Sequence, residues 1–461
     1  QVSLYDISKS AAQTVRLRLA TSCDYRAPIA DIGIDKFTLA EMPAAVALDT
    51  AVPSLRSVDL SWSESLLGPS FVRYEVWRST SAIVSVTNGQ MIFESPDVAT
   101  TACTDTGLNI GGTYYYKVFT IDERDTFIPS NELSATTVPV AIPFSDPMET
   151  MANWVTGSNN ANESTWSVRT DMPHGGAASL ASVPVGQYAQ ASDTYIETAV
   201  DLRGTEWPVL TFWDRHGLNT GDWIRLEVSG TGGPNIQPYG AYDSSRTDWS
   251  RQRIDLSPWK GLGNVKLRFR LVSDNAATPG EGWFIDDLSV GENPNRNSPL
   301  GLPFTDDFES DGAGWLLSSW SAGSDASPVD GTAILRDGGT GRRMAPDTQQ
   351  WAVLDRPVTL PLASKLQATC WIRGSLGTNS YLRLGYSTNG GLNWSDLSAV
   401  RRNSGFNSNG EWERAQVSLY DISKSAAQTV RLRLATSCDY RAPIADIGID
   451  KFTLAEMPAA V

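Results

Sequence analysis

The same 46 residues stand at the beginning and at the end of this chain. Gln1–Val46 is repeated without one difference as Gln416–Val461. Old copies drift apart, so identity indicates a recent duplication or one period of a tandem array. We interpret the chain as one repeat of about 415 residues plus the overlapping segment. An artificial duplication is the alternative.

A fainter repeat lies inside this period. The matching pairs keep their order along the chain: PFSDPMET (143–150) with PFTDDFES (303–310), DWIRLEVSGTGG (222–233) with SYLRLGYSTNGG (380–391), VKLRFRLVSD (265–274) with VRLRLATSCD (430–439), and FIDDLSVGE (284–292) with GIDKFTLAE (448–456). We therefore predict two diverged copies of one domain: domain A, residues 142–292, and domain B, residues 301–461.

Both copies have the sequence pattern of an all-β fold. VKLRFRL and VRLRL alternate apolar and polar residues, which is the period of a half-buried strand. GTGG and STNGG are hairpin signals, and no long apolar stripe has helical spacing. About eight strands in roughly 150 residues predict a two-sheet jelly roll.

Residues 47–138 have a different pattern. VDLSW (58–62), FVRYEVWRSTS (71–81) and GTYYYKVFTID (112–122) follow one another in the order of a fibronectin type III domain, which this region resembles. The resemblance implies that Trp62 is the core tryptophan of the second strand. It also implies that Tyr114 or Tyr116 forms a tyrosine corner. Short linkers that contain proline, TVPVAIP and ENPNRNSPLG, predict stiff spacing between domains.

Segment 1–46 would be the last three strands of a B domain. Alone it would have open edges and a bare apolar face, so it needs the rest of a B domain from a preceding repeat or from another molecule. The apolar residues of this predicted assembly surface are Val2, Leu4, Ile7, Val15, Leu17, Leu19, Ile32, Ile34, Phe37 and Leu39.

Domains A and B also carry motifs of a known kind of module. D-x-[FM]-E near the start, STNGGLNW (387–394) and a closing I-D-[DK]-[LF]-[ST] resemble MAM-like jelly rolls of secreted bacterial proteins, including those beside immune inhibitor A-type proteases, and some carbohydrate-binding modules. In such modules a calcium ion can join the opening acidic turn to the closing strand. The candidate ligands are Asp146, Glu149 and Asp286 in A, and Asp306, Glu309 and Asp450 in B. The alternative is that these acids cap turns and accept hydrogen bonds from backbone amides.

The chain lacks the motifs of common catalytic sites. Its two histidines, His174 and His216, form no HExxH, and neither G-x-S-x-G nor a P-loop occurs. Carboxylate pairs such as Asp286–Asp287 do not by themselves indicate a glycosidase. We expect no enzymatic activity, and we expect His216 to be a loop or edge residue.

The cysteines leave two interpretations open. Cys370 and Cys438 both lie in B and both are absent from the matching positions of A, as a bonded pair would be. A Cys370–Cys438 disulfide would imply an oxidising compartment, and buried free thiols are the alternative. Cys103 is expected to be a buried thiol.

Charge restricts the partners. The net charge of −15 disfavours nucleic acid and anionic membranes, and no apolar run is long enough to span a bilayer. Glycans could stack on exposed tryptophans, although most tryptophans of a β-sandwich lie in its core. The candidates are Trp213, Trp223, Trp259, Trp283, Trp371 and Trp394.

These features predict a structural protein. No signal peptide opens the chain, and Gln1 is not a natural start, so we expect a mature or excised piece. The predicted function is the repeat unit of a secreted, extracellular filament, stalk or giant adhesion protein that assembles head-to-tail with copies of itself. The alternatives are an array of carbohydrate-binding modules, or ancillary domains of a secreted hydrolase.

Overall fold

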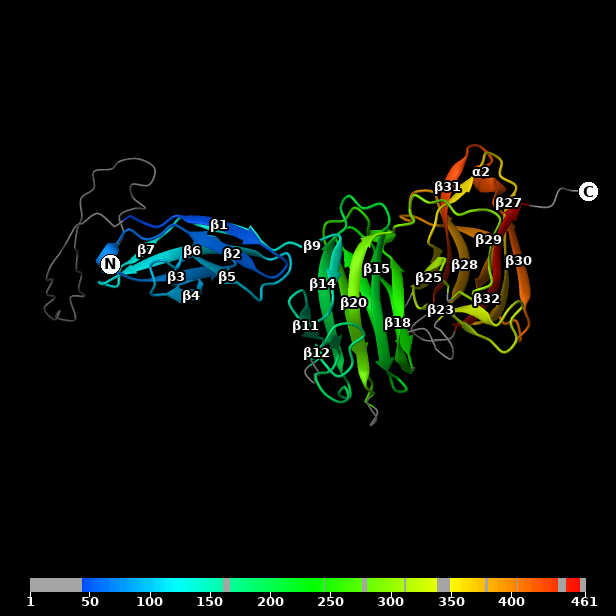
Figure 1. Ribbon diagram of the computed structural model, residues 1–461, viewed down its shortest axis with the longest axis horizontal. Helices are drawn as coiled ribbons and strands as arrows, with labels where there is room; N and C mark the ends of the chain where they lie inside the picture. Colours follow the sequence, from blue (N-terminus) through cyan, green and yellow to red (C-terminus); the bar gives the residue numbers. More distant parts are fainter. Residues whose placement is uncertain are drawn as a thin grey trace, which may run out of the picture.

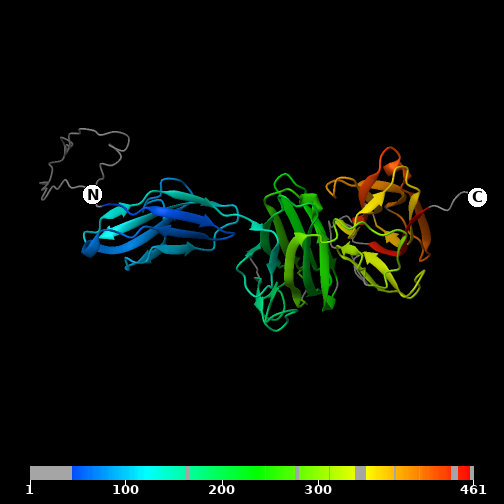
Figure 2. The same cartoon turned by 45° about the horizontal axis from the view of Figure 1, so that its top comes forward.

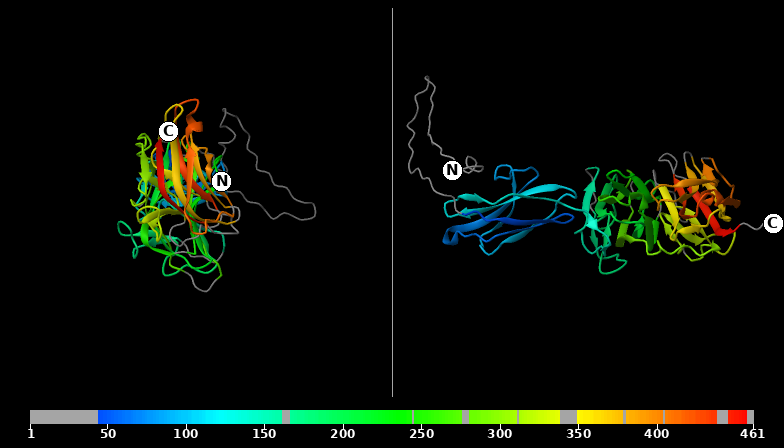
Figure 3. Two further views of the ribbon diagram at one scale, coloured as in Figure 1. Left: turned by 90° about the vertical axis from the view of Figure 1, so that its right-hand side faces the viewer. Right: turned by 90° about the horizontal axis from the view of Figure 1, so that it is seen from above.

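Three β-sandwiches follow one another in a row (Figure 1). The computed structural model describes residues 44–160, 166–243, 245–275, 280–310, 312–337, 349–377, 380–403, 405–437 and 445–456. The fibronectin type III-like domain lies at one end, A in the middle and B at the other end, and the row persists in the turned views (Figures 2 and 3). Within these ranges, no helix is long and apolar enough to cross a membrane.

The first domain is a sandwich of two antiparallel sheets. One sheet has the order β1-β2-β5 and the other β4-β3-β6-β7, with β8 also paired to β6. Its elements are β1 (Leu48–Pro53), β2 (Val58–Trp62), η1 (Gly68–Ser70), β3 (Phe71–Ser79), β4 (Gln90–Ser95), β5 (Ala102–Asp105), β6 (Thr113–Asp122), β7 (Phe127–Pro129) and β8 (Leu133–Thr136).

The core of this domain contains the predicted landmarks. Trp62 is buried on β2 and meets Tyr74 edge-on, with ring centroids 5.7 Å apart. The hydroxyl of Tyr114 accepts a hydrogen bond from the backbone N–H of Asn109 at 3.0 Å, so Tyr114 forms the tyrosine corner. Tyr116 is buried in the same core. The fibronectin type III pattern therefore describes this domain correctly.

One boundary residue has a second role and one expectation needs correction. Val46 is the last residue of the repeated segment and also packs in the core of the fibronectin-like domain. Cys103 is only half-buried against that core, because it lies on the edge strand β5, although burial still raises the pKa of its thiol to about 12.

Domain A is a sandwich of two six-stranded sheets. One has the order β12-β13-β20-β15-β18 with β10 paired to β20, and the other β11-β14-β19-β16-β17 with β9 paired to β14. The elements are β9 (Val140–Ala141), β10 (Phe144–Asp146), β11 (Val155–Ser158), β12 (Ser167–Arg169), β13 (Ser179–Ala181), β14 (Asp193–Asp201), β15 (Pro208–Gly217), β16 (Trp223–Gly230), β17 (Ile236–Tyr242), β18 (Ser245–Asp255), η2 (Ser257–Trp259), β19 (Val265–Val272) and β20 (Gly282–Glu292).

Domain B repeats the order of the five main strands in each sheet, with β25 and β26 together in the place of β14. Its sheets have the orders β23-β24-β32-β27-β30, with β21 paired to β32, and β22-β25-β31-β28-β29, with β26 paired to β31. The elements are β21 (Phe304–Asp306), β22 (Trp315–Leu317), β23 (Trp320–Ser324), β24 (Ala333–Asp337), β25 (Gln349–Leu354), β26 (Val358–Leu360), β27 (Leu366–Leu376), β28 (Tyr381–Ser387), β29 (Ser395–Asn403), β30 (Glu413–Ser418), α2 (Tyr420–Ser423), β31 (Gln428–Ser437) and β32 (Ala445–Glu456). The additional short strands raise the number above the predicted eight.

The strand β15 shows how the sequence builds these sheets. Alternate residues of a strand point to opposite faces, and here Leu210, Phe212 and Asp214 are buried between the sheets while Trp213 is half-buried on the outer face. A register shift follows Thr211 in A, and one follows its counterpart Thr369 in B.

His216 does not lie in a loop or at a sheet edge, as the sequence suggested. It is 1% exposed at the inner end of β15, between β18 and β20, where its Nδ1 is 3.7 Å from a carboxylate oxygen of Asp214. The alternation of β15 continues through this residue and turns the imidazole inward.

Candidate functional site: the interface between domains A and B

Domain B has a core of its own, but four of its apolar residues pack into the hydrophobic core of domain A. Leu316, Trp351, Val353 and Ala435 of B are buried in the same cluster as the core residues of A. They bring β25 beside β17 and β22 beside β18. The core of the fibronectin-like domain contains residues of that domain alone. B is therefore docked on A through apolar side chains, whereas the first domain has its own core and contacts A through polar groups, such as Arg56, which donates to the carbonyl of Trp154 at 2.5 Å.

A buried ion pair crosses this interface. The guanidinium of Arg431 in B lies 2.8 Å from Asp255 in A, and their side chains are 5% and 2% exposed. Arg431 also donates to the Ser257 hydroxyl at 2.5 Å and stacks 3.7 Å from the ring centroid of Trp207. Burial lowers the pKa of Arg431, and the nearby Asp255 opposes that shift.

Further polar contacts fix the position of B on A. The backbone N–H of Gly240 donates to the Ser319 hydroxyl at 2.9 Å, and Ser318 donates to the carbonyl of Pro238. Arg253 on β18 donates to the carbonyl of Trp315 at 3.1 Å. These bonds satisfy polar groups at the edge of the apolar contact, so they specify one orientation of the two domains.

The linker between A and B is part of the interface. Asn293 donates to the carbonyl of Asp355 at 2.9 Å, and Asn295 donates to its carboxylate at 2.8 Å. In the preceding linker, Val140 and Ala141 form the strand β9, which pairs with β14. Both linkers are thus fastened by hydrogen bonds, and proline stiffness is not the only restraint.

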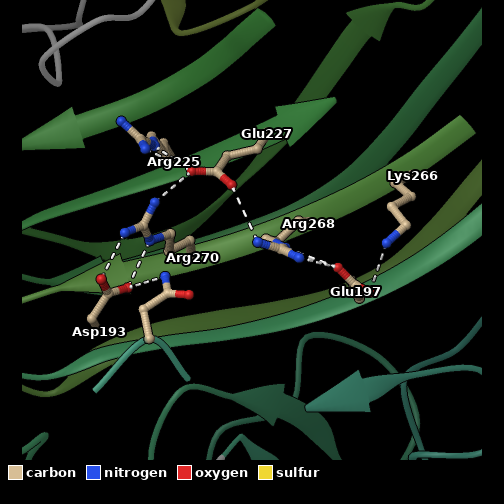
Figure 4. A network of polar contacts seen from close by, with 8 residues as sticks. Asp193, Glu197, Arg225, Glu227, Lys266, Arg268 and Arg270 are labelled. Atoms are coloured by element: carbon tan, nitrogen blue, oxygen red, sulfur yellow. Dashed lines mark hydrogen bonds and ion pairs between the residues drawn. The ribbon is translucent and has the colours of Figure 1, made fainter. Parts of the chain in front are cut away.

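Domain B docks through the outer face of the sheet that contains β25 and β31. The equivalent sheet face of domain A is charged. Figure 4 shows acidic and basic side chains that alternate across β14, β16 and β19. Glu197 lies 2.7 Å from Arg268, and Glu227 lies 3.0 Å from Arg270. The full network consists of Asp193, Glu197, Arg225, Glu227, Lys266, Arg268 and Arg270.

Comparing the two copies explains why only the face on B is docked. By strand register, Val353 of B stands where A has Glu197, and Ala435 stands where A has Arg270. Replacing charges by small apolar groups removes the desolvation cost of docking, whereas the charged face on A is stable in water. This difference was visible in the sequence once A and B were aligned, because Glu197 and Arg270 of A match Val353 and Ala435 of B, although Arg431 and Arg433 keep a charge on the same face of B.

The predicted metal ligands bind backbone amides in the described structure. In A, Asp286 accepts from the N–H of His174 at 2.7 Å, and Glu149 accepts from Ala177 at 2.8 Å. In B, Asp450 accepts from Val329 at 2.6 Å. Asp146 and Asp306 each accept from an amide and a tryptophan indole, and Glu309 accepts from Thr332 and Ala333.

These contacts match the alternative prediction from the sequence, in which the acidic residues cap turns and accept hydrogen bonds from backbone amides. Among the residues that the structure describes, no group of three or more His, Cys, Asp or Glu side chains could hold a metal ion. Bound calcium is not needed to account for the observed positions of these carboxylates, and it stays a prediction.

The structure describes one of the two cysteines of the predicted disulfide. Cys370 is a fully buried thiol on β27, and burial raises its pKa to about 12. Cys438 lies outside the described residues. The bond between them stays a prediction.

The tryptophans proposed for glycan stacking divide into two groups. Trp259 and Trp283 are fully buried in A and cannot contact a ligand. Four are half-buried at the surface of a sheet or at the interface: Trp213, Trp223, Trp371 and Trp394.

The predicted assembly residues of segment 1–46 lie outside the described residues, but their twins in B are described. Leu419, Val430, Leu432, Leu434, Ile447, Ile449 and Phe452, the twins of Leu4, Val15, Leu17, Leu19, Ile32, Ile34 and Phe37, are at most 1% exposed. Val417, the twin of Val2, is half-buried. Val417 lies on β30, Leu419 directly precedes the short helix α2, and the others lie on β31 and β32. Of these strands, β31 is paired between β25 and β28, and β32 between β24 and β27.

Comparison with known proteins gives partial matches. No family model matches the chain. Bacillopeptidase F of Bacillus subtilis (strain 168) is 27% identical over 144 residues, which is 30% of this chain and 10% of that protein. The chain therefore spans about a tenth of the length of this curated relative.

Solved structures with similar β-sandwiches were also found. The CBM22-1-CBM22-2 tandem of Paenibacillus barcinonensis Xyn10C covers 70% of this chain and 100% of its own, at 13% identity and a TM-score of 0.25. TmCBM61 in complex with β-1,4-galactotriose covers 31% and 91%, at 18% identity and 0.24. The sixth fibronectin type III domain of a human fibronectin type III domain containing protein covers 22% and 90%, at 15% identity and 0.19.

Proposed function

We propose that the chain is a non-catalytic structural repeat of an extracellular bacterial protein, which assembles head-to-tail into a filament or stalk. The observation that carries this proposal is the position of the repeated sequence in B. Its strands β31 and β32 are central in the two sheets, and they supply core residues to both. An identical segment at 1–46 has the same apolar side chains and needs an equivalent frame.

The block of A and B supports a load-bearing role. Its apolar contacts and buried ion pair hold the relative orientation of these two domains, so A and B together contribute one rise and rotation to each repeat. Resemblance of the motifs to modules of secreted bacterial proteins supports the extracellular location. The match to one tenth of bacillopeptidase F supports an accessory rather than a catalytic role for the shared part.

Electron microscopy of the native material, together with denaturing mass measurement, tests this proposal. A regular filament built from one very large polypeptide would support a covalent tandem array. A filament that dissolves into chains of 50.0 kDa would instead support strand exchange between separate molecules. Discrete monomers in both measurements would refute the structural role.

Glycan binding is the second candidate function. The observation that favours it is a cleft of about 190 Å³ between A and B, lined in part by Trp213, Trp249 and Trp320. Aromatic rings beside polar groups are the usual lining of a site that holds a sugar ring.

A further inference from the structure

We infer that the cleft between A and B binds a negatively charged sugar residue of an extracellular polysaccharide. The ligand class rests on glycan binding, the second candidate function. This inference does not depend on whether the chain assembles into a filament. The cleft is formed by β15, β17 and β18 of A together with β22 and β23 of B, so it exists only when the two domains are docked.

The aromatic wall of the cleft is rigid. Trp213 stacks on the ring of His174 with centroids 4.0 Å apart and planes at 18°. Trp249 meets the same His174 ring edge-on at 5.7 Å. His174 is in turn held by Asp287, 2.7 Å from its Nδ1. A fixed ring that remains half-exposed can receive the apolar face of a pyranose at little entropic cost.

The charge of the lining selects the ligand. Arg246 and Arg251 are the charged residues among the described residues that line the cleft, and no carboxylate is among them. This is unusual in a chain of net charge −15. The buried carboxylate of Asp214 forms an ion pair with Arg246, so this arginine is fixed in place. Arg251 is exposed and forms no ion pair within the part of the chain that the structure describes.

A guanidinium with free donors binds carboxylate and sulfate groups in its own plane. Arg251 is exposed at the cleft, so its guanidinium donors are accessible to such a group. A neutral sugar would leave the charge of Arg251 unpaired. Uronate and sulfate sugars share the chemistry that pairs it.

The size of the cleft limits how much of the polysaccharide enters. About 190 Å³ is several times the roughly 30 Å³ of one water, but it is below the roughly 300 Å³ at which most ligand pockets begin. A single ring fits, while its neighbours along the polysaccharide lie in solvent. Affinity per site is then low, and repeated copies of the cleft would raise it by avidity.

Domain B provides matched controls. Its Trp371, Trp412 and Arg414 stand at the positions of Trp213, Trp249 and Arg251 in strand register. Arg414 is exposed like Arg251, but it does not line the cleft. Trp223 on the charged face of A is half-buried beside Arg225, 4.3 Å away, and controls for loss of a tryptophan.

The test is calorimetric titration of the full chain with three probes: trigalacturonic acid, its neutral methyl ester and a sulfated galactose trisaccharide. We expect the acid or the sulfated probe to bind at least tenfold more tightly than the ester. Trp249→Ala and Arg251→Gln should each weaken that binding about tenfold, whereas Trp223→Ala and Arg414→Gln should leave it within twofold.

The outcomes separate the ligand class from glycan binding itself. Equal affinity for the acid and its ester would overturn the charged ligand but leave glycan binding intact. No binding of any probe would overturn both. An equal loss in Arg251→Gln and Arg414→Gln would show non-specific attraction and refute the cleft. Because Arg251 is exposed, its variant tests the site even if Trp249→Ala fails to fold.

Discussion

Removing Arg431 should weaken the interface between A and B more than any substitution at an exposed charge. Arg431→Ala leaves the Asp255 carboxylate, which is 2% exposed, without its partner. Breaking a buried pair in this way costs about 3–5 kcal/mol. For a unit larger than 250 residues, 1 kcal/mol shifts Tm by about 2 °C, so we expect a loss of roughly 6–10 °C.

Differential scanning calorimetry measures this loss. The transition of the fibronectin-like domain should not move, since its core contains no residue of A or B. Lys266→Ala is the control, because Lys266 is the counterpart of Arg431 in A and its pair with Glu197 is 43% exposed on the lysine side. It should cost less than about 1 kcal/mol.

A double variant examines the cause. Adding Asp255→Ala to Arg431→Ala removes the stranded carboxylate and should recover part of the lost stability. If Arg431→Ala lowers Tm by less than 2 °C, or if the double variant is as unstable as the sum of the two single ones, the pair does not hold the domains together and the reasoning is wrong.

Three further predictions concern docking, acid stability and calcium. Val353→Glu gives B the residue that A carries at the matching position, Glu197. The buried charge should lower the free energy of unfolding by at least about 3 kcal/mol and should separate the unfolding of A and B into two calorimetric transitions. A single unshifted transition would contradict this prediction. Burial raises the pKa of Asp214, but Arg246, His216 and Tyr239 outweigh this effect and hold the pKa at about 2. The ionised Asp214 therefore stabilises the folded state by about 2 kcal/mol above pH 4, and this stabilisation is lost as the pH falls from about 4 to 2. Urea unfolding should show the gap between wild type and Asp214→Asn closing over that range, and a gap independent of pH would count against this. Since backbone amides bind the predicted calcium ligands, EDTA should leave Tm within about 1 °C, whereas a fall of several degrees would establish a bound ion.

The sequence by itself determined the type and order of the domains. Residues 265–272 alternate apolar and polar because one face of β19 is buried, and residues 430–434 of β31 show the same alternation of residue types, although docking also buries Arg431 on the other face. Trp62 and the tyrosines of GTYYYKV indicated the fibronectin-like sandwich, and the structure chose Tyr114 over Tyr116 as the tyrosine corner. The aligned motifs of A and B predicted a common topology, and the sheets have it.

The tertiary structure alone decided which faces meet. Trp351 and Val353 alternate with core residues on β25, so in isolation they resemble exposed or core positions equally well, and only docking on A buries both faces of that strand. His216 was misplaced for the same reason: its burial depends on β18 and β20, which are distant in sequence. Periodicity records that a residue is buried, but the partner that covers it is set by long-range packing.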